Sequence, residues 1–213
     1  MSAHVTGRVG ALGLLALVGC GDAGGQRLTL ALRAGGTEAQ EVAIRGGSIQ
    51  LGEARLALGP LYLCAATSAD PELCETAVGE WLDARSLDAL EPAGVTLGEI
   101  NAVGGSVRSA QLDYGISWLL TRTAPEPSAD APGGHSAVLS GSAQGKDGTS
   151  VSFEAAVDLP PLTRGGSALS LRIDEHALVD GRTLLLRVDP NAWVARVRYA
   201  DLFALDQDGD GQV

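Results

Sequence analysis

The stretch QRLTLALRA, residues Gln26–Ala34, alternates leucine with other residue types. Leu28, Leu30 and Leu32 fall on every second position. A period of two is typical of a β-strand with one buried face, because successive side chains point to opposite faces of a sheet. The stretch therefore predicts a strand whose leucines enter a hydrophobic core.

The same alternation recurs along the chain. It is found in QLDYGISWLL (111–120), VSFEAAVDL (151–159) and ALSLRID (168–174). Further strands are expected at Glu41–Arg45, Ile49–Leu58, Pro60–Ala65, Ser136–Ala143 and Arg182–Val188. Glycine pairs and Asp-Gly pairs between these stretches are typical of turns. Many short strands separated by turn residues favour an antiparallel β-sandwich.

Helices are expected to be minor. Short ones are predicted within Pro71–Ser86 and within Pro190–Leu205, while the Pro-, Ala- and Gly-rich segment Thr123–His135 predicts an exposed loop. The predicted fold class is therefore all-β, an antiparallel β-sandwich over residues 27–205 with one or two short helices.

The first residues have a different composition. Arg8 precedes an apolar run, Val9–Val18, and Gly19-Cys20 follows it. A cleaved export signal typically has a charged N-terminal region, a short apolar run and small residues at the cleavage site. A helix that spans a membrane needs about 20 apolar residues. We therefore expect residues 1–19 to be a signal peptide that is removed.

Leu17-Val18-Gly19-Cys20 resembles the lipobox of bacterial lipoproteins, in which the cysteine is acylated and becomes the first mature residue. The resemblance implies that Cys20 carries the lipid and that residues 20–26 form a flexible, Gly-rich tether. In this family an aspartate after the cysteine retains the protein at the inner membrane. Gly21 stands there in this chain, which implies attachment to the outer membrane of the bacterial cell envelope.

The protein is acidic. Its formal net charge is −11, and loss of residues 1–19 removes Arg8 and no acidic residue, which gives −12. Nucleic-acid binding needs clusters of lysine and arginine, and so does electrostatic attachment to anionic lipid. We therefore expect no nucleic-acid partner and a membrane contact through the lipid alone.

Two cysteines remain once Cys20 is assigned to the lipid, Cys64 and Cys74. Disulfides form in oxidising compartments outside the inner membrane. Asp70-Pro71 lies between the two cysteines and can turn the chain back. We predict a Cys64–Cys74 disulfide, worth about 2–3 kcal/mol on the loop-entropy account. The alternative, a redox or metal site, would need closer spacing and neighbouring histidine or cysteine ligands.

The chain ends on DQDGDGQV, which resembles the first eight positions of an EF-hand or dockerin-type calcium loop. Asp206, Asp208 and Asp210 stand at its first, third and fifth positions. Gly211 stands at the sixth position, where the chain turns, and Val213 at the apolar eighth. The resemblance implies a Ca²⁺ ion held by these three carboxylates and by the backbone carbonyl of Gln212.

The loop stops before the twelfth position, where an EF-hand places a bidentate glutamate. We therefore expect a protein partner or a chain extension to complete the calcium site. The alternative interpretation is a solvated acidic tail that binds no ion.

Other kinds of site are suggested by fewer residues of the sequence. His135 or His176, with Asp174 and Glu175, could form a transition-metal site, and the chain has a faint similarity to β-sandwich copper-handling periplasmic proteins. Ser136 follows His135, but the glycine that completes a nucleophile elbow is missing. Sugar stacking would need exposed aromatic rings, and the tryptophans are Trp81, Trp118 and Trp193.

The sequence thus predicts a lipid-anchored envelope protein that acts as a non-catalytic binding or structural module with a C-terminal calcium loop. Two alternatives stay open, a periplasmic metal-handling protein and a hydrolase whose site is assembled from distant residues.

Overall fold

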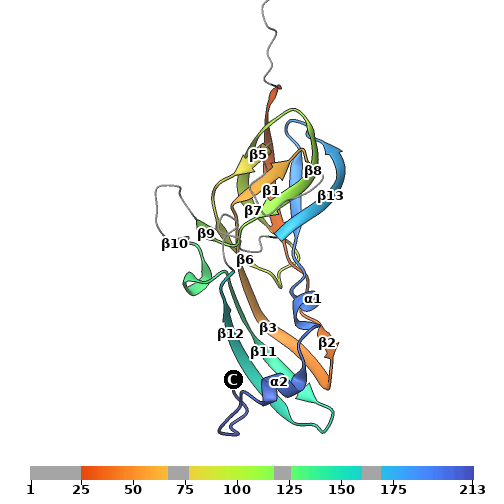
Figure 1. The fold of residues 1–213 in the computed structure, drawn as a ribbon, viewed down its shortest axis with the longest axis vertical. Coiled ribbons are helices and arrows are strands. Elements are labelled where there is room, and N and C mark those ends of the chain that lie inside the picture. Colours follow the sequence, from red (N-terminus) through yellow and green to blue (C-terminus); the bar gives the residue numbers. More distant parts are fainter. Residues whose placement is uncertain (1–24, 67–76, 118–125, 160–168) are drawn as a thin grey trace, which may run out of the picture.

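The computed structural model describes residues 25–66, 77–117, 126–159 and 169–213. The molecule is elongated, and its described residues form two larger β-sheets placed end to end and one small two-stranded sheet, with short helices beside the lower of the two larger sheets (Figure 1). The predicted all-β class is therefore confirmed. None of the helices in the described ranges is long and apolar enough to cross a membrane.

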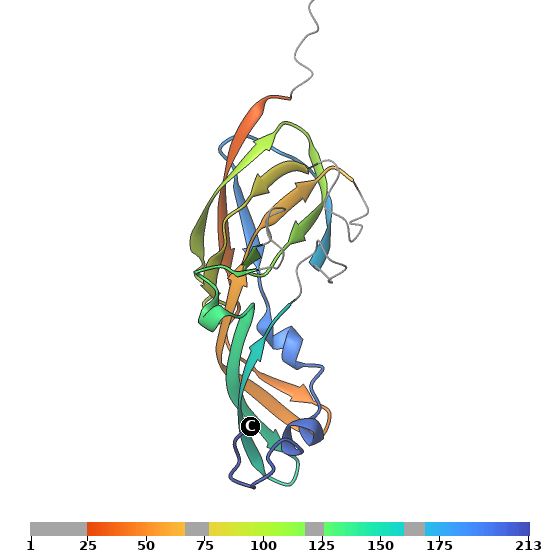
Figure 2. The same ribbon diagram turned by 60° about the vertical axis from the view of Figure 1, so that its left-hand side comes forward.

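The upper sheet has seven strands in the order β13-β8-β4-β5-β7-β1-β14, and it curls strongly (Figure 2). Its strands are β1 (Arg27–Gly35), β4 (Leu61–Cys64), β5 (Ala77–Trp81), β7 (Val95–Val103), β8 (Ser106–Leu112), β13 (Leu169–Ala177) and β14 (Thr183–Arg187). Neighbouring strands are antiparallel except at one edge, where β14 runs parallel to β1.

The lower sheet has the order β12-β11-β3-β2, and β6 pairs with the upper end of β3. Its strands are β2 (Glu41–Ile44), β3 (Gly47–Leu58), β6 (Arg85–Asp88), β11 (Ala137–Gly145) and β12 (Ser150–Val157). The remaining elements are the pair β9 (Ile116–Ser117) and β10 (Glu126–Pro127), the 3-10 turn η1 (Pro132–Gly134), α1 (Pro190–Val194) and α2 (Tyr199–Phe203).

Two hydrophobic clusters fill the molecule. The first lies inside the curled sheet and contains Leu28, Leu30 and Leu32, which confirms the alternation of the opening stretch. The second lies between the lower sheet and the helices and contains Val151 of β12 and Tyr199 of α2. Strand β3 takes part in both, because Ile49 and Leu51 belong to the second cluster and Leu56 and Leu58 to the first.

Polar side chains attach the helices to the lower sheet. The buried Asn191 side chain accepts a hydrogen bond from the Gln40 amide at 3.2 Å and donates to the Glu38 carbonyl at 2.9 Å. The Tyr199 hydroxyl of α2 lies 2.6 Å from Thr149 Oγ1. The Thr149 hydroxyl also donates to Asp147, and this bond lowers the pKa of the exposed Asp147 carboxyl.

The five further strands predicted from the sequence are confirmed within a few residues, as β2, β3, β4, β11 and β14. Within Pro71–Ser86 the prediction of a helix is wrong from residue 77 onward, since β5 and the start of β6 lie there. Residues 71–76 lie outside the described residues. The reason is tertiary pairing: β5 lies between β4 and β7 and buries Trp81, which outweighs local helix propensity.

The stretch 111–120 is not one strand. Strand β8 ends at Leu112, and the chain turns at Gly115, whose φ is 70°. A side chain at Gly115 would meet Ala57, so the turn requires glycine. The short helix predicted within Pro190–Leu205 is confirmed, and the segment contains two, because the backbone leaves helical geometry at Arg198, before Tyr199.

A matched pair of valines tests the position of the upper core. Val107 on β8 is 2% exposed and Val103 on β7 is 38% exposed. Val107→Ala should lower the free energy of unfolding by about 2 kcal/mol, because it removes buried methyl groups and leaves a cavity. Val103→Ala should cost less than about 1 kcal/mol. Urea unfolding measures both, and equal losses would contradict this core.

Candidate functional site

The C-terminal loop brings three carboxylates together. Oxygen atoms of Asp206, Asp208 and Asp210 lie within 4.8 Å of one another, at the lower end of the molecule (Figure 1). Asp206 organises the loop, because its carboxylate accepts hydrogen bonds from the amides of Gly209 at 2.9 Å and Gly211 at 3.0 Å. The predicted metal-binding positions are therefore grouped in space.

Two glycines permit this loop. Gly209 has a φ of 72° and Gly211 a φ of 79°, values that L-residues other than glycine rarely adopt. The turn expected at Gly211 is thus present. Gly209 was not singled out from the sequence, although it follows directly after Asp208 and makes the first of the two turns.

The residues after the loop attach to the edge of β12. The Ser152 amide donates to the Gly211 carbonyl at 2.8 Å, and the Val213 amide donates to the Ser152 carbonyl at 2.9 Å. The Glu154 amide donates to the Val213 carbonyl at 2.9 Å. Gln212 is bridged in parallel to Ser152. The segment Gly211–Val213 therefore adds a short parallel strand to the lower sheet, and the acidic tail is attached to the fold.

The loop offers a hard cation part of a coordination shell. Ca²⁺ takes six to eight oxygen ligands, and alternate aspartates supply carboxylate oxygens of the type it prefers. Three such side chains converge here. Further oxygens would have to come from backbone carbonyls, water or another molecule.

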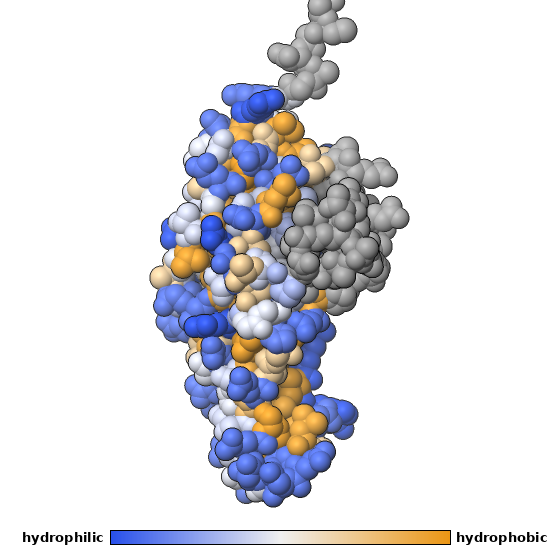
Figure 3. Space-filling model, turned by 90° about the vertical axis from the view of Figure 1, so that its left-hand side faces the viewer, coloured by the Kyte–Doolittle hydropathy of each residue, from blue (hydrophilic) through white to orange (hydrophobic). Residues whose placement is uncertain are grey.

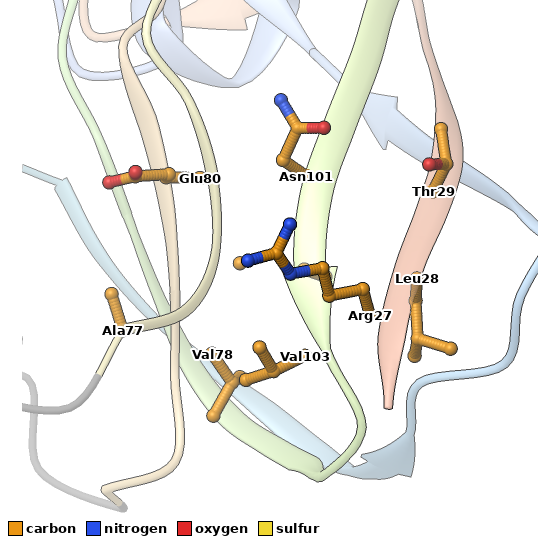
Figure 4. Close-up of a pocket in the computed structure, with 10 residues that line it drawn as sticks. Arg27, Leu28, Thr29, Ala77, Val78, Glu80, Asn101 and Val103 are labelled. Atoms are coloured by element: carbon orange, nitrogen blue, oxygen red, sulfur yellow. The ribbon is translucent and has the colours of Figure 1, made fainter. Parts of the chain in front are cut away.

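A second candidate is a groove of about 470 Å³ on the upper sheet (Figure 4). Its polar side chains come from three strands: Arg27 and Thr29 from β1, Glu80 from β5 and Asn101 from β7. A second hollow of about 410 Å³ shares Glu80 and Asn101. Sequence reasoning missed these residues, because strand pairing alone brings them together.

The carboxylate of Glu80 affects the pKa of the neighbouring Tyr62 side chain. The pKa of Tyr62 is raised because the ring is half-buried, and the carboxylates of Asp113 and Glu80 add to the effect. A higher pKa keeps this phenol neutral. Tyr62 does not line the groove, whose lining contains one positive side chain, Arg27, and one negative side chain, Glu80.

His135 is one of the two histidines from which a transition-metal site could be built, and it lies next to a carboxylate. His135 Nδ1 lies 3.0 Å from Asp158 Oδ1. Ser136 is fully buried, and its hydroxyl accepts a hydrogen bond from the Leu159 amide at 3.1 Å. No Ser–His pair is therefore formed at this point of the chain, which removes the one nucleophile suggested by the sequence.

Several other predicted residues are only partly described. The side chains of Asp174, Glu175 and His176 on β13 lie outside the described part, as do Cys20, Cys74 and Trp118. Cys64 is 2% exposed at the end of β4. Because Cys74 lies outside the described residues, the predicted Cys64–Cys74 disulfide stays a prediction. Trp81 belongs to the upper core, while Trp193 is 40% exposed on α1. These two rings therefore form no shared stacking platform.

The surface of the lower end is mainly hydrophilic, with one hydrophobic area above it (Figure 3). Phe203 and Leu205, next to the acidic loop, are 50% and 63% exposed.

No protein-family model matches the chain. No curated protein and no solved structure matches it either.

The role of Asp206 can be separated from that of its neighbour. Asp206→Ala removes both bonds that hold the glycine amides and should free Gly211–Val213, lowering the backbone order parameters there from about 0.85 to below about 0.6. Asp208→Ala removes one long bond of 3.4 Å and should leave the segment ordered. Amide ¹⁵N relaxation measures both variants. Equal mobility in the two would contradict the role given to Asp206.

Proposed function

We propose that the protein is a lipid-anchored lipoprotein of the bacterial cell envelope, held at the outer membrane through Cys20. In this proposal it acts as a non-catalytic binding or structural module, and its C-terminal loop binds Ca²⁺. The observation that carries the calcium proposal is the convergence of Asp206, Asp208 and Asp210 within 4.8 Å.

Electrostatics supports an ion at this loop. Carboxylates so close together repel one another, and a divalent cation among them would replace repulsion with attraction. The described loop contains no basic residue that could do this instead. Its segment Gly211–Val213 is hydrogen-bonded to β12, so ion binding would also stabilise the edge of the lower sheet.

The arrangement of the two ends supports the anchor. Strand β1, which follows the proposed tether, begins at the upper end of the molecule, and the acidic loop lies at the lower end (Figure 2). A lipid on Cys20 would therefore attach the protein at the end opposite the acidic loop.

Calcium binding can be measured by calorimetric titration in millimolar Mg²⁺. The protein should bind Ca²⁺ with a Kd of about 10⁻⁴–10⁻³ M, since the set of side-chain ligands is incomplete. The double variant Asp208→Ala, Asp210→Ala should give no heat, because it removes both side-chain oxygen ligands. Asp201→Ala is the matched control, because Asp201 is acidic and near but is paired with Arg198 at 2.6 Å. Absence of heat in the unmodified protein would refute the calcium proposal.

Mass spectrometry and membrane fractionation test the anchor together. The mature protein should begin at an acylated Cys20 and sediment with membranes, while Cys20→Ala should lose the lipid mass and leave the membrane fraction. Cys64→Ala is the control, which should stay membrane-bound. The same spectra report the predicted Cys64–Cys74 bridge, because reduction should add the mass of two hydrogen atoms to the mature protein and none to Cys64→Ala. Retention of Cys20→Ala in the membrane fraction argues against acylation.

A further inference from the structure

The Trp81 side chain is a buried hydrogen-bond donor without a protein acceptor. It is 5% exposed and belongs to the upper core, and its indole Nε1–H forms no hydrogen bond with any residue in the described ranges. A buried indole N–H ordinarily has a partner, and a buried donor without one is unfavourable. A water molecule or a ligand would supply the acceptor that this nitrogen lacks.

A glycine of β7 keeps this nitrogen uncovered. Gly98 has a φ of 155°, and the pairing of β7 with β1 shifts register next to it, between Leu32 and Arg33. A Cβ atom at Gly98 would lie 3.0 Å from Trp81 Nε1, closer than side-chain carbons normally come to another atom. Any other residue would therefore crowd the indole nitrogen. Irregular pairing of this kind is frequent next to functional sites.

A hollow opens where β5 and β7 part. The two strands pair at only two positions, and the second pair is Glu80 with Asn101. The hollow of about 410 Å³ begins at this pair, and Trp81 and Gly98 line it. Glu80 and Asn101 also line the groove of about 470 Å³ at Arg27, so the two spaces adjoin (Figure 4). Together they are large enough for a ligand of several rings.

The rim of the hollow offers mainly hydrogen-bond acceptors. Glu80, Glu99 and Asn101 are exposed, and their side chains form no hydrogen bond or ion pair within the part of the chain that the structure describes. Arg85, by contrast, is paired with Asp130 at 3.0 Å. An ionised carboxylate only accepts hydrogen bonds, whereas an indole N–H only donates. A ligand that satisfies both must therefore donate and accept.

This requirement selects one class of ligand. A protonated polyamine carries only donors and would leave the indole N–H unpaired. An anion would be repelled by Glu80 and Glu99. A peptide that adds a strand needs an open sheet edge, and β5 and β7 each have a neighbouring strand on both sides. A hydroxyl group both donates and accepts, so a neutral, hydroxyl-rich sugar fits the hollow.

We propose that the hollow between β5 and β7 binds a neutral oligosaccharide. One sugar oxygen accepts a hydrogen bond from Trp81 Nε1, and neighbouring hydroxyls donate to Glu80 and Glu99. The groove at Arg27 holds the adjacent sugar unit. Recognition is by hydrogen bonds rather than by stacking, because the indole ring itself is buried in the core. Neither the acidic loop nor Cys20 takes part, so this inference goes beyond the proposed function and is independent of it.

The test uses the full chain in detergent with EDTA present, so that calcium has no part in the result. The probes are maltotriose, cellotriose and N-acetylchitotriose, and spermidine is the comparison ligand. NMR follows the indole ¹⁵N–H signals, of which the one lost in Trp81→Phe belongs to Trp81. At least one trisaccharide should shift this signal with saturation. By calorimetry, Trp81→Phe should bind that sugar about ten-fold more weakly, because it keeps a ring in the core but has no donor.

Three further variants complete the test. Gly98→Ala places a methyl carbon against the indole nitrogen and should abolish the shift, and Glu99→Ala should weaken binding about ten-fold. Glu41→Ala is the matched control, because Glu41 is an exposed carboxylate on β2 of the lower sheet, and it should bind normally. If Gly98→Ala fails to fold, Trp81→Phe and Glu99→Ala still decide the outcome.

Three results would overturn the proposal. The first is that no trisaccharide shifts the Trp81 signal, which would leave water as the acceptor of the indole N–H. The second is that spermidine binds more tightly than all three sugars. The third is that Trp81→Phe and Glu99→Ala bind the sugar as well as the unmodified protein does.

Discussion

Strand β3 connects two hydrophobic cores, and the rest of the structure depends on that continuity. Its lower part buries Ile49 and Leu51 beneath the helices, while its upper end buries Leu56 and Leu58 inside the curled sheet. Because one strand contributes side chains to both clusters, it joins the two sheets, with a bulge in its pairing to β11 between its two parts. The acidic loop is thereby held at the end of the molecule opposite the start of β1 (Figure 1).

The lower sheet also determines how the acidic loop is presented. An uncovered edge strand tends to pair with other chains, and the segment Gly211–Val213 covers part of β12. The carboxylate of Asp206 fixes the turn that delivers this segment. Backbone pairing therefore holds the loop at one side, and the charges of Asp208 and Asp210 remain beside it without a basic partner within the loop.

The sequence predicted those strands in which buried and exposed side chains alternate along the chain. Leu28, Leu30 and Leu32 alternate, and they are buried as the alternation requires. Strand β7 was not predicted, because Gly98, Glu99 and Asn101 have low β-propensity and its stability comes from pairing with β1. The acidic loop could be recognised because its three aspartates stand at alternate positions of one short segment. The groove at Arg27 and the contacts to β12 could not, since they depend on pairing between distant segments.

Residue-resolved hydrogen exchange during a calcium titration tests most directly whether the loop and the sheet edge form one unit. The Glu154 amide donates to the Val213 carbonyl, whereas the Ala156 amide has no partner in the described chain. Calcium should slow exchange at Glu154 in proportion to the occupancy of the loop and leave Ala156 unchanged. An unchanged rate at Glu154 when the loop is saturated with calcium would show that the ion and the edge of β12 are not coupled.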